Sequence, residues 1–458
     1  MRQVFPAVSV ALNRTLLAGV IAVSPLLVGK AVDAVAPGVI EISSAVAQVK
    51  AKNKHAGEQR KFPNVTESFG KKITEAANYL QPPEESAKPD PRKAMQLLNE
   101  MAANSAKANA YEKVLLNQYM GYAYLGSENY AKAIESFNKM LAQTPNMPVA
   151  TEAATIRIVG QLYSQMDNPR KALETLLKWT DYADSLKPED SYMFSTLYYQ
   201  LEDNKNALLN INEAVKNQEA AGKVPAESWY VLQRGLYFDK EDYKSGLVVL
   251  EKLIKHYPKA QYWKQLSQVY YVVERQKESL YALETCYLMG GLSTEKDIIR
   301  LASMYLESEV PYKAAKVLKK GIYTDKVVEP TAKNLKLLAD SLRLAQNAKE
   351  SLVEYEKAAE KSTDGDLIIG LAQAYLATDK YKEASKWGRQ ALKAGKLKRV
   401  DYANLTVAQA EFELKNFDEA IKYFKEAGKD ARSAKVAGQW VTFSEREKAR
   451  LEALAQQE

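Results

Sequence analysis

The sequence has few of the residues that hold metals or form covalent cross-links. Among 458 residues it contains one cysteine, Cys286, and only two histidines, His55 and His256. One cysteine excludes an intramolecular disulfide, and two distant histidines do not complete a zinc site of the usual kind. The sequence therefore predicts a protein without a structural metal or cofactor, whose fold depends on packing.

The chain also lacks a strong excess of charge of either sign. Its formal net charge is +7 and its sequence pI is about 8.9, whereas nucleic-acid binders concentrate far more Lys and Arg on one face. Hydrophobic residues at 46% and charged residues at 26% are near globular averages, which argues against wholesale disorder and against a polytopic membrane protein. Since 458 residues exceed what one core organises, we expect several domains or an open-ended stack of repeats, without nucleic acid as a partner.

The amino terminus holds the apolar run most typical of an export signal. Residues 15–29 are mostly apolar, follow Arg2 and Arg14, and are too few for a membrane span of about 20 residues. Small-x-small cleavage sites follow at residues 34–36 and 45–47. We predict that residues 1–47 are a signal peptide cleaved after Ala47, giving a periplasmic protein without stable membrane insertion. An uncleaved amphipathic helix or membrane anchor is the alternative.

Residues 48–65 are polar and basic and show little apolar periodicity. They contain five cations, which are Lys50, Lys52, Lys54, Arg60 and Lys61. We expect this segment to be a flexible leader. A basic arm for an acidic partner or for lipid head groups is the functional alternative.

A helix-pair pattern repeats through most of the remaining chain. In its first copy, the small residue Gly121 and the aromatic Tyr124 lie on one expected helix, and Ala133 and Phe137 lie on the next. Only small residues allow two helices to cross closely, and larger residues fill the space around them. The small residue of the second helix recurs as Ala133, Ala172, Ala207, Gly246, Ser279, Ala314, Ser351, Ala384 and Ala420. This spacing is typical of a repeat of about 34 residues with loop insertions.

The repeats define the expected organisation of the chain. Residues 66–113 read as a degenerate N-terminal helix pair, residues 114–430 as the repeat array, and residues 431–458 as a C-terminal capping helix with a solvated outer face. We predict an all-α, right-handed superhelical solenoid of about nine to ten helix-turn-helix repeats.

Residues 114–429 resemble the tetratricopeptide-repeat (TPR) superfamily, on the recurring pattern described above. The order of a secretion signal, a basic segment around residues 60–63, a helix pair and degenerate repeats also resembles exported TPR proteins of bacterial TonB energy-transduction systems. The resemblance implies a non-enzymatic periplasmic scaffold, an accessory of a TonB–ExbB–ExbD complex for nutrient uptake across the outer membrane. An adaptor for outer-membrane protein, exopolysaccharide or pilus assembly is the alternative. No residue-level signature carries over, and no non-repeat region remains that is large enough for an active site.

In such a stack, certain positions of each first helix tend to line the concave surface. Here these positions hold residues able to anchor a partner peptide, namely Tyr122, Tyr192, Tyr199, Phe238, Lys264, Gln268 and Tyr271. Packing between repeats is an equally good interpretation of each. Only Lys264 and Gln268 approximate the Lys and Asn pair of TPR proteins that bind chaperone tails, so recognition of a terminal carboxylate is not expected. Cys286 takes a second-helix position usually held by alanine, and we interpret it as a buried packing residue.

Overall fold

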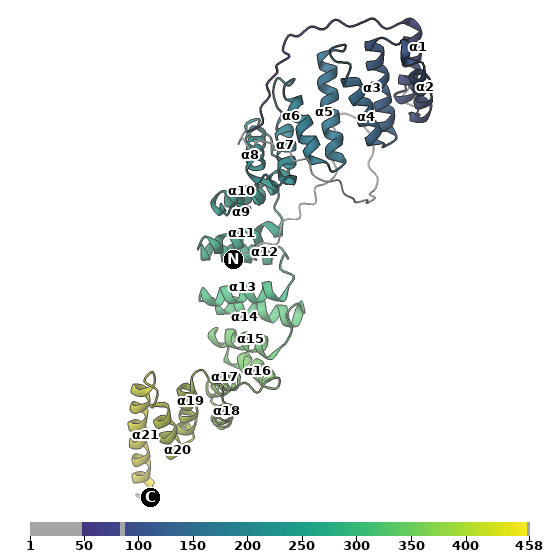
Figure 1. The fold of residues 1–458 in the computed structure, drawn as a ribbon. Helices are drawn as coiled ribbons and strands as arrows, with labels where there is room; N and C mark the ends of the chain where they lie inside the picture. The colour runs from purple at the N-terminus through teal and green to yellow at the C-terminus, as the bar shows by residue number, and fades with distance from the viewer. Residues whose placement is uncertain (1–47, 83–87, 456–458) are drawn as a thin grey trace. The chain divides into compact units, whose positions relative to one another are not determined.

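The computed structural model describes residues 48–82 and 88–455, and every regular element in these ranges is helical (Figure 1). The all-α fold class predicted from the sequence is confirmed. The predicted signal peptide, residues 1–47, lies outside the described residues. Among the helices that are described, none combines the length and apolar character needed to cross a membrane.

The chain divides into two compact units, which meet in the sequence between Tyr257 and Pro258. Unit 1 ends at Tyr257 and contains ten α-helices within its described residues. They are α1 (Glu67–Leu80), α2 (Pro91–Ala103), α3 (Ala110–Gly126), α4 (Tyr130–Leu141), α5 (Val149–Gln165), α6 (Pro169–Trp179), α7 (Pro188–Gln200), α8 (Asn204–Ala220), α9 (Glu227–Asp239) and α10 (Tyr243–His256), with a short 3-10 turn at Ser105–Lys107.

Unit 2 begins at Pro258 and contains eleven α-helices within its described residues. They are α11 (Ala260–Val272), α12 (Gln276–Leu288), α13 (Glu295–Glu307), α14 (Pro311–Lys319), α15 (Ala332–Leu344), α16 (Ala348–Ala359), α17 (Gly365–Leu376), α18 (Tyr381–Ala394), α19 (Val400–Glu413), α20 (Phe417–Ala427) and α21 (Ala434–Ala455), with a π-helical turn at Lys320–Thr324.

From α3 to α20 the helices form nine hairpins that share one turn geometry. Each turn places a residue with positive φ, between 56° and 63°, after its first helix; these residues are Glu128, Asp167, Glu202, Glu241, Glu274, Glu309, Gln346, Asp379 and Lys415. The amide of the following residue then donates to a carbonyl five residues earlier, as from Asn129 to Tyr124 at 2.9 Å. This is the helix C-cap in which a left-handed residue turns the chain back. The turns recur in step with the small residues found in the sequence, which confirms the predicted register.

The helices of a hairpin cross where the sequence places its smallest residues. A Cβ added to Gly121 would lie 2.4 Å from the Phe137 ring, and one added to Gly160 would lie 2.5 Å from Cγ of Leu176. The α9–α10 hairpin differs, because Arg234 occupies the first-helix position. There the close approach occurs at Gly246, where an added Cβ would lie 2.1 Å from the Phe238 ring.

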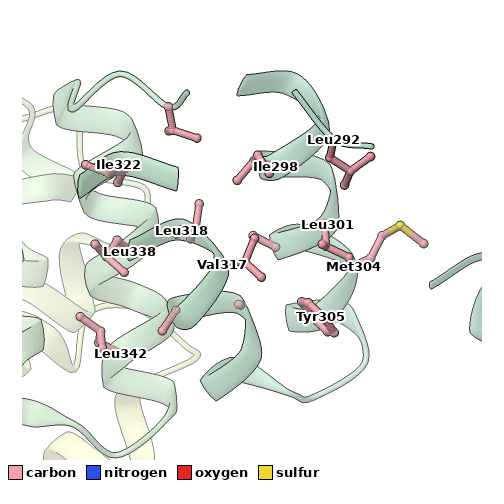
Figure 2. Packing of buried hydrophobic residues seen from close by; sticks show 14 of the residues in the cluster. Leu292, Ile298, Leu301, Met304, Tyr305, Val317, Leu318, Ile322, Leu338 and Leu342 are labelled. Atoms are coloured by element: carbon pink, nitrogen blue, oxygen red, sulfur yellow. The ribbon is translucent and has the colours of Figure 1, made fainter. Parts of the chain in front are cut away.

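In unit 2 the core continues from one hairpin into the next. Figure 2 shows this in unit 2, where Leu301 of α13, Leu318 of α14 and Leu338 of α15, all fully buried, belong to one cluster. The hairpins of this cluster thus complete one another's core, as expected of a repeat array. At the end of unit 2, α21 packs on α20, and Trp440 stacks on Phe424 with ring centroids 5.4 Å apart.

The basic leader differs from the sequence expectation. Residues 48–65 were expected to be flexible, but they lie against unit 1, passing from α1 along α3 and α5 toward α8 (Figure 1). The Lys52 amide donates to the Thr180 carbonyl at 2.8 Å, and Val49 is buried. The sequence did not reveal these contacts because their partners lie far along the chain, 161 residues away for Val49 and Asn210.

Candidate protein-binding surface

All seven residues predicted to bind a partner lie on first helices of hairpins, namely on α3, α7, α9 and α11. We call the side of each unit that these positions form its first-helix face. In unit 1 it holds Tyr122 of α3, Tyr192 and Tyr199 of α7, and Phe238 of α9; in unit 2 it holds Lys264, Gln268 and Tyr271 of α11.

Three of the four aromatic residues predicted in unit 1 pack against neighbouring helices. The Tyr122 ring meets the Phe137 ring edge-on at 5.7 Å, and the Tyr192 ring stacks on Trp229 of α9 at 5.1 Å. Phe238 fills the close crossing over Gly246. The packing interpretation that the sequence left open is therefore the better account of these three residues.

Tyr199 is the remaining aromatic candidate of unit 1. Its side chain is half-buried. The pKa of its hydroxyl is raised mainly by this burial and to a smaller extent by the Asp239 carboxylate. Burial also raises the pKa of Asp239. Tyr199 stays a candidate because its side chain is only half-buried.

Lys264 makes an ion pair between consecutive first helices of unit 2. Its Nζ lies 2.7 Å from Oδ2 of Asp297 on α13, and the same oxygen accepts a hydrogen bond from Thr294 at 2.8 Å. Unit 1 repeats this arrangement between Arg157 of α5 and Asp190 of α7. Because Lys264 already has a carboxylate partner, it is poorly placed to bind a terminal carboxylate of another protein. Gln268, one turn further along α11, is half-buried.

Tyr271 is the one predicted residue whose side chain is mostly open to solvent. It is 58% exposed, and the guanidinium of Arg300 on α13 lies 5.6 Å from its ring centroid. The cation–π contact holds an aromatic ring and a cation side by side on successive repeats. Tyrosine and arginine are enriched among the residues that contribute most to protein interfaces.

Sequence reasoning identified Lys264 but not its partner Asp297, and it missed Arg157 and Arg300. Arg157 pairs with Asp190 and also lies over Trp179, with its guanidinium carbon 4.6 Å from the ring centroid. The separation from Arg157 to Asp190 is 33 residues, and that from Lys264 to Asp297 is also 33. Aligning the repeats and searching for a cation one repeat before an acid would have found both pairs.

Neither a metal centre nor a reactive thiol is found in the part of the chain that the structure describes. No group of three potential metal-binding side chains occurs in these residues. Cys286 is fully buried, and burial raises the pKa of its thiol, which agrees with the packing role inferred from its repeat position.

Comparison with known proteins gives one family match and several similar solved structures. A family model described as tetratricopeptide repeat matches residues 402–427, which lie in α19 and α20. A comparison with curated proteins gives no match. Similar solved structures include a TPR protein from Parabacteroides merdae, with 13% identity over 57% of this chain and 99% of that chain, at a TM-score of 0.33. MamA from Desulfovibrio magneticus RS-1 has 19% identity over 38% of this chain and 95% of that chain, at a TM-score of 0.30.

The hairpin that the family model matches shares its turn geometry with the eight hairpins before it. Each has a left-handed residue after the first helix, and each buries a small residue at the start of the second helix. The nine hairpins from α3 to α20 therefore share the architecture of the hairpin that the tetratricopeptide-repeat model matches.

Proposed function

We propose that this protein is a non-enzymatic scaffold that binds another protein through the first-helix face of unit 2. Tetratricopeptide repeats suggest a protein-interaction role in general. The observation that supports this particular surface is the exposed Tyr271 beside Arg300, on consecutive first helices. A partner segment laid across α11 and α13 would cover the ring and receive hydrogen bonds from the guanidinium.

We further propose that the scaffold acts in the bacterial periplasm as an accessory of a TonB–ExbB–ExbD complex. The order of signal-like run, basic segment and repeats supports this proposal through its resemblance to exported TPR proteins. Fractionation of cells tests the location: the mature chain is expected in the periplasm with its amino terminus near Gln48. Full-length protein in the cytosol with Met1 intact would contradict it.

The binding surface is tested with two tyrosines of the same hairpin. Tyr271 on α11 and Tyr281 on α12 are 58% and 60% exposed, so Tyr271→Ala and Tyr281→Ala remove the same ring from equally exposed sites on different faces. Each tagged full-length variant is crosslinked in cells with TonB, ExbB and ExbD, and the captured proteins are quantified. Circular dichroism checks that both variants are folded.

We expect Tyr271→Ala to reduce capture by roughly thirtyfold, the equivalent of about 2 kcal/mol for a central aromatic anchor. Tyr281→Ala should bind as the unmodified chain does. Equal binding by a folded Tyr271→Ala variant would exclude this face. Capture of outer-membrane assembly, exopolysaccharide or pilus proteins in place of TonB components would support the adaptor function instead.

A further inference from the structure

The most extensive peptide-like contact in unit 1 is made by the chain's own leader. The leader, residues 48–65, and the following Thr66 lie across a surface that we call the leader edge. It is formed by Tyr111 and Glu112 on α3, Glu152 on α5, and Asp181 and Tyr182 in the loop after α6. As the leader runs from Val49 to Thr66, its partners run from α8 back to α3. It therefore crosses the repeats in the direction opposite to their order.

Main-chain hydrogen bonds fix the first part of this segment. The Val49 amide donates to Oδ1 of Asn210 at 3.3 Å, the Lys52 amide to the Thr180 carbonyl at 2.8 Å, and the Lys54 amide to the Asp181 carbonyl at 2.7 Å. Three amides of this stretch therefore bond to the repeats, and a turn at residues 54–57 follows them. Contacts of this kind do not depend on side-chain identity.

Charge complementarity adds selectivity for cations. Lys54 Nζ lies 3.0 Å from Asp181 Oδ2, and this hydrogen bond is the main cause that lowers the pKa of Asp181. Arg60 pairs with Glu152, and the two side chains are only 6% and 7% exposed. Arg60 also donates to Glu58 at 2.6 Å. An ion pair as buried as Arg60 and Glu152 is sensitive to the loss of either partner, since the other charge then stays buried and unpaired.

Aromatic contacts fix the register of the segment. The His55 ring stacks on Tyr182 with centroids 4.2 Å apart, and the Phe62 ring packs on Tyr111 at 4.4 Å. At the end of the leader, the amide and hydroxyl of Thr66 donate to Oε1 of Glu112 at 2.9 and 2.6 Å. The leader edge thus pairs with a cation at position 54, a second cation at 60 and an aromatic ring at 62.

We propose that the leader edge is a docking surface for a basic segment of another protein, which displaces the chain's own residues 48–66. The segment would repeat the spacing of Lys54, Arg60 and Phe62. The leader is itself a peptide seated on the edge, and it shows which chemistry the edge accepts. This surface belongs to unit 1 and is independent of the first-helix face proposed for unit 2.

The tethered leader sets the affinity that a competitor must have. A segment attached by a short connection acts at an effective concentration on the order of millimolar. If the free peptide binds the empty edge at about 10 μM, the tethered copy weakens competing binding by roughly a hundredfold. Weakening the tethered copy should therefore reveal strong binding of the same peptide added in trans.

The experiment measures binding of a fluorescent peptide with the sequence of residues 48–66 to the full-length chain, by anisotropy. The release variant combines Lys54→Glu with Arg60→Glu. The control combines Lys50→Glu with Lys61→Glu, which makes the same charge change at two exposed lysines of the leader. Hydrogen exchange of the leader reports its release, and circular dichroism reports folding. If the double variant does not fold, Arg60→Gln replaces it.

We expect the release variant to bind the peptide at least tenfold more tightly than the unmodified chain, and the control to bind as the unmodified chain does. Adding Glu152→Lys to the release variant should abolish the gain. Three results would each overturn the proposal: a released leader without peptide binding, which indicates a permanent structural element; a leader that stays protected in the release variant; or equal binding of a shuffled peptide of the same composition.

Discussion

Two glycines in unit 1 provide a direct test of the packing argument. Gly160 lies within α5 and Gly235 within α9, and both are buried. A Cβ at Gly160 would lie 2.5 Å from Cγ of Leu176, whereas a Cβ at Gly235 would meet nothing within 4 Å. Gly160→Ala and Gly235→Ala are therefore the same chemical change, with and without a steric clash.

The two variants share the gain in helix propensity, which is about 1 kcal/mol for replacing an interior glycine by alanine. Gly235→Ala should consequently stabilise unit 1 by up to about 1 kcal/mol. Gly160→Ala adds the cost of overpacking against the branch point of a buried leucine, roughly 1 to 3 kcal/mol. Because the propensity gain cancels in the comparison, the difference between the variants should equal this steric cost.

Urea denaturation of the full chain, with hydrogen exchange to localise the effect, measures the difference. In Gly160→Ala, faster exchange should be concentrated in α5, α6 and the adjoining hairpins, because repeats are coupled mainly to their neighbours. In Gly235→Ala, exchange in α9 and α10 should slow. Equal stabilities of the two variants would refute the close-crossing argument.

Three further variants test other features of the fold. Ala133→Phe inserts a ring at a fully buried crossing and should lower stability by at least about 1 to 3 kcal/mol; a thermal melt like that of the unmodified chain would contradict the repeat register. Hydrogen bonds from Arg399, and next from Ser433, hold the pKa of buried Asp401 well below its usual range. The stabilisation that results is present above about pH 4 and is lost as the pH falls further. Asp401→Asn should therefore flatten the acid side of a curve of Tm against pH. Glu202 has a φ of 61°, a conformation that glycine adopts more easily than glutamate. Glu202→Gly should therefore raise the free energy of unfolding by roughly 0.5 kcal/mol, measured as a higher urea midpoint. A lower midpoint would exclude backbone strain at this turn.

The fold was predictable because its signals are local and recur. A small residue at each helix crossing is a requirement of sterics, and it returned at every repeat from Ala133 to Ala420. The turns themselves were not visible, since their left-handed positions hold residues such as Glu128 and Lys415 in place of glycine. The C-cap geometry became evident only from the backbone.

The candidate site was less predictable, because exposure depends on neighbours that a repeat pattern does not identify. Tyr192 and Tyr271 both lie at first-helix positions, yet Trp229 covers the first, while the second stays open beside Arg300. The leader illustrates the same limit. Its cations look solvated in sequence, and only the folded chain brings Glu152 to Arg60 from 92 residues away.

The path of the leader also affects the order in which unit 1 can be completed during synthesis. Repeat arrays normally form from nearest-neighbour contacts, so each hairpin can fold soon after it is made. Val49, however, binds Asn210, and 161 residues must be added to the chain before this contact exists. The leader therefore docks stepwise: its Thr66 end can bind Glu112 after 46 residues, whereas its Val49 end must wait until α8 is made.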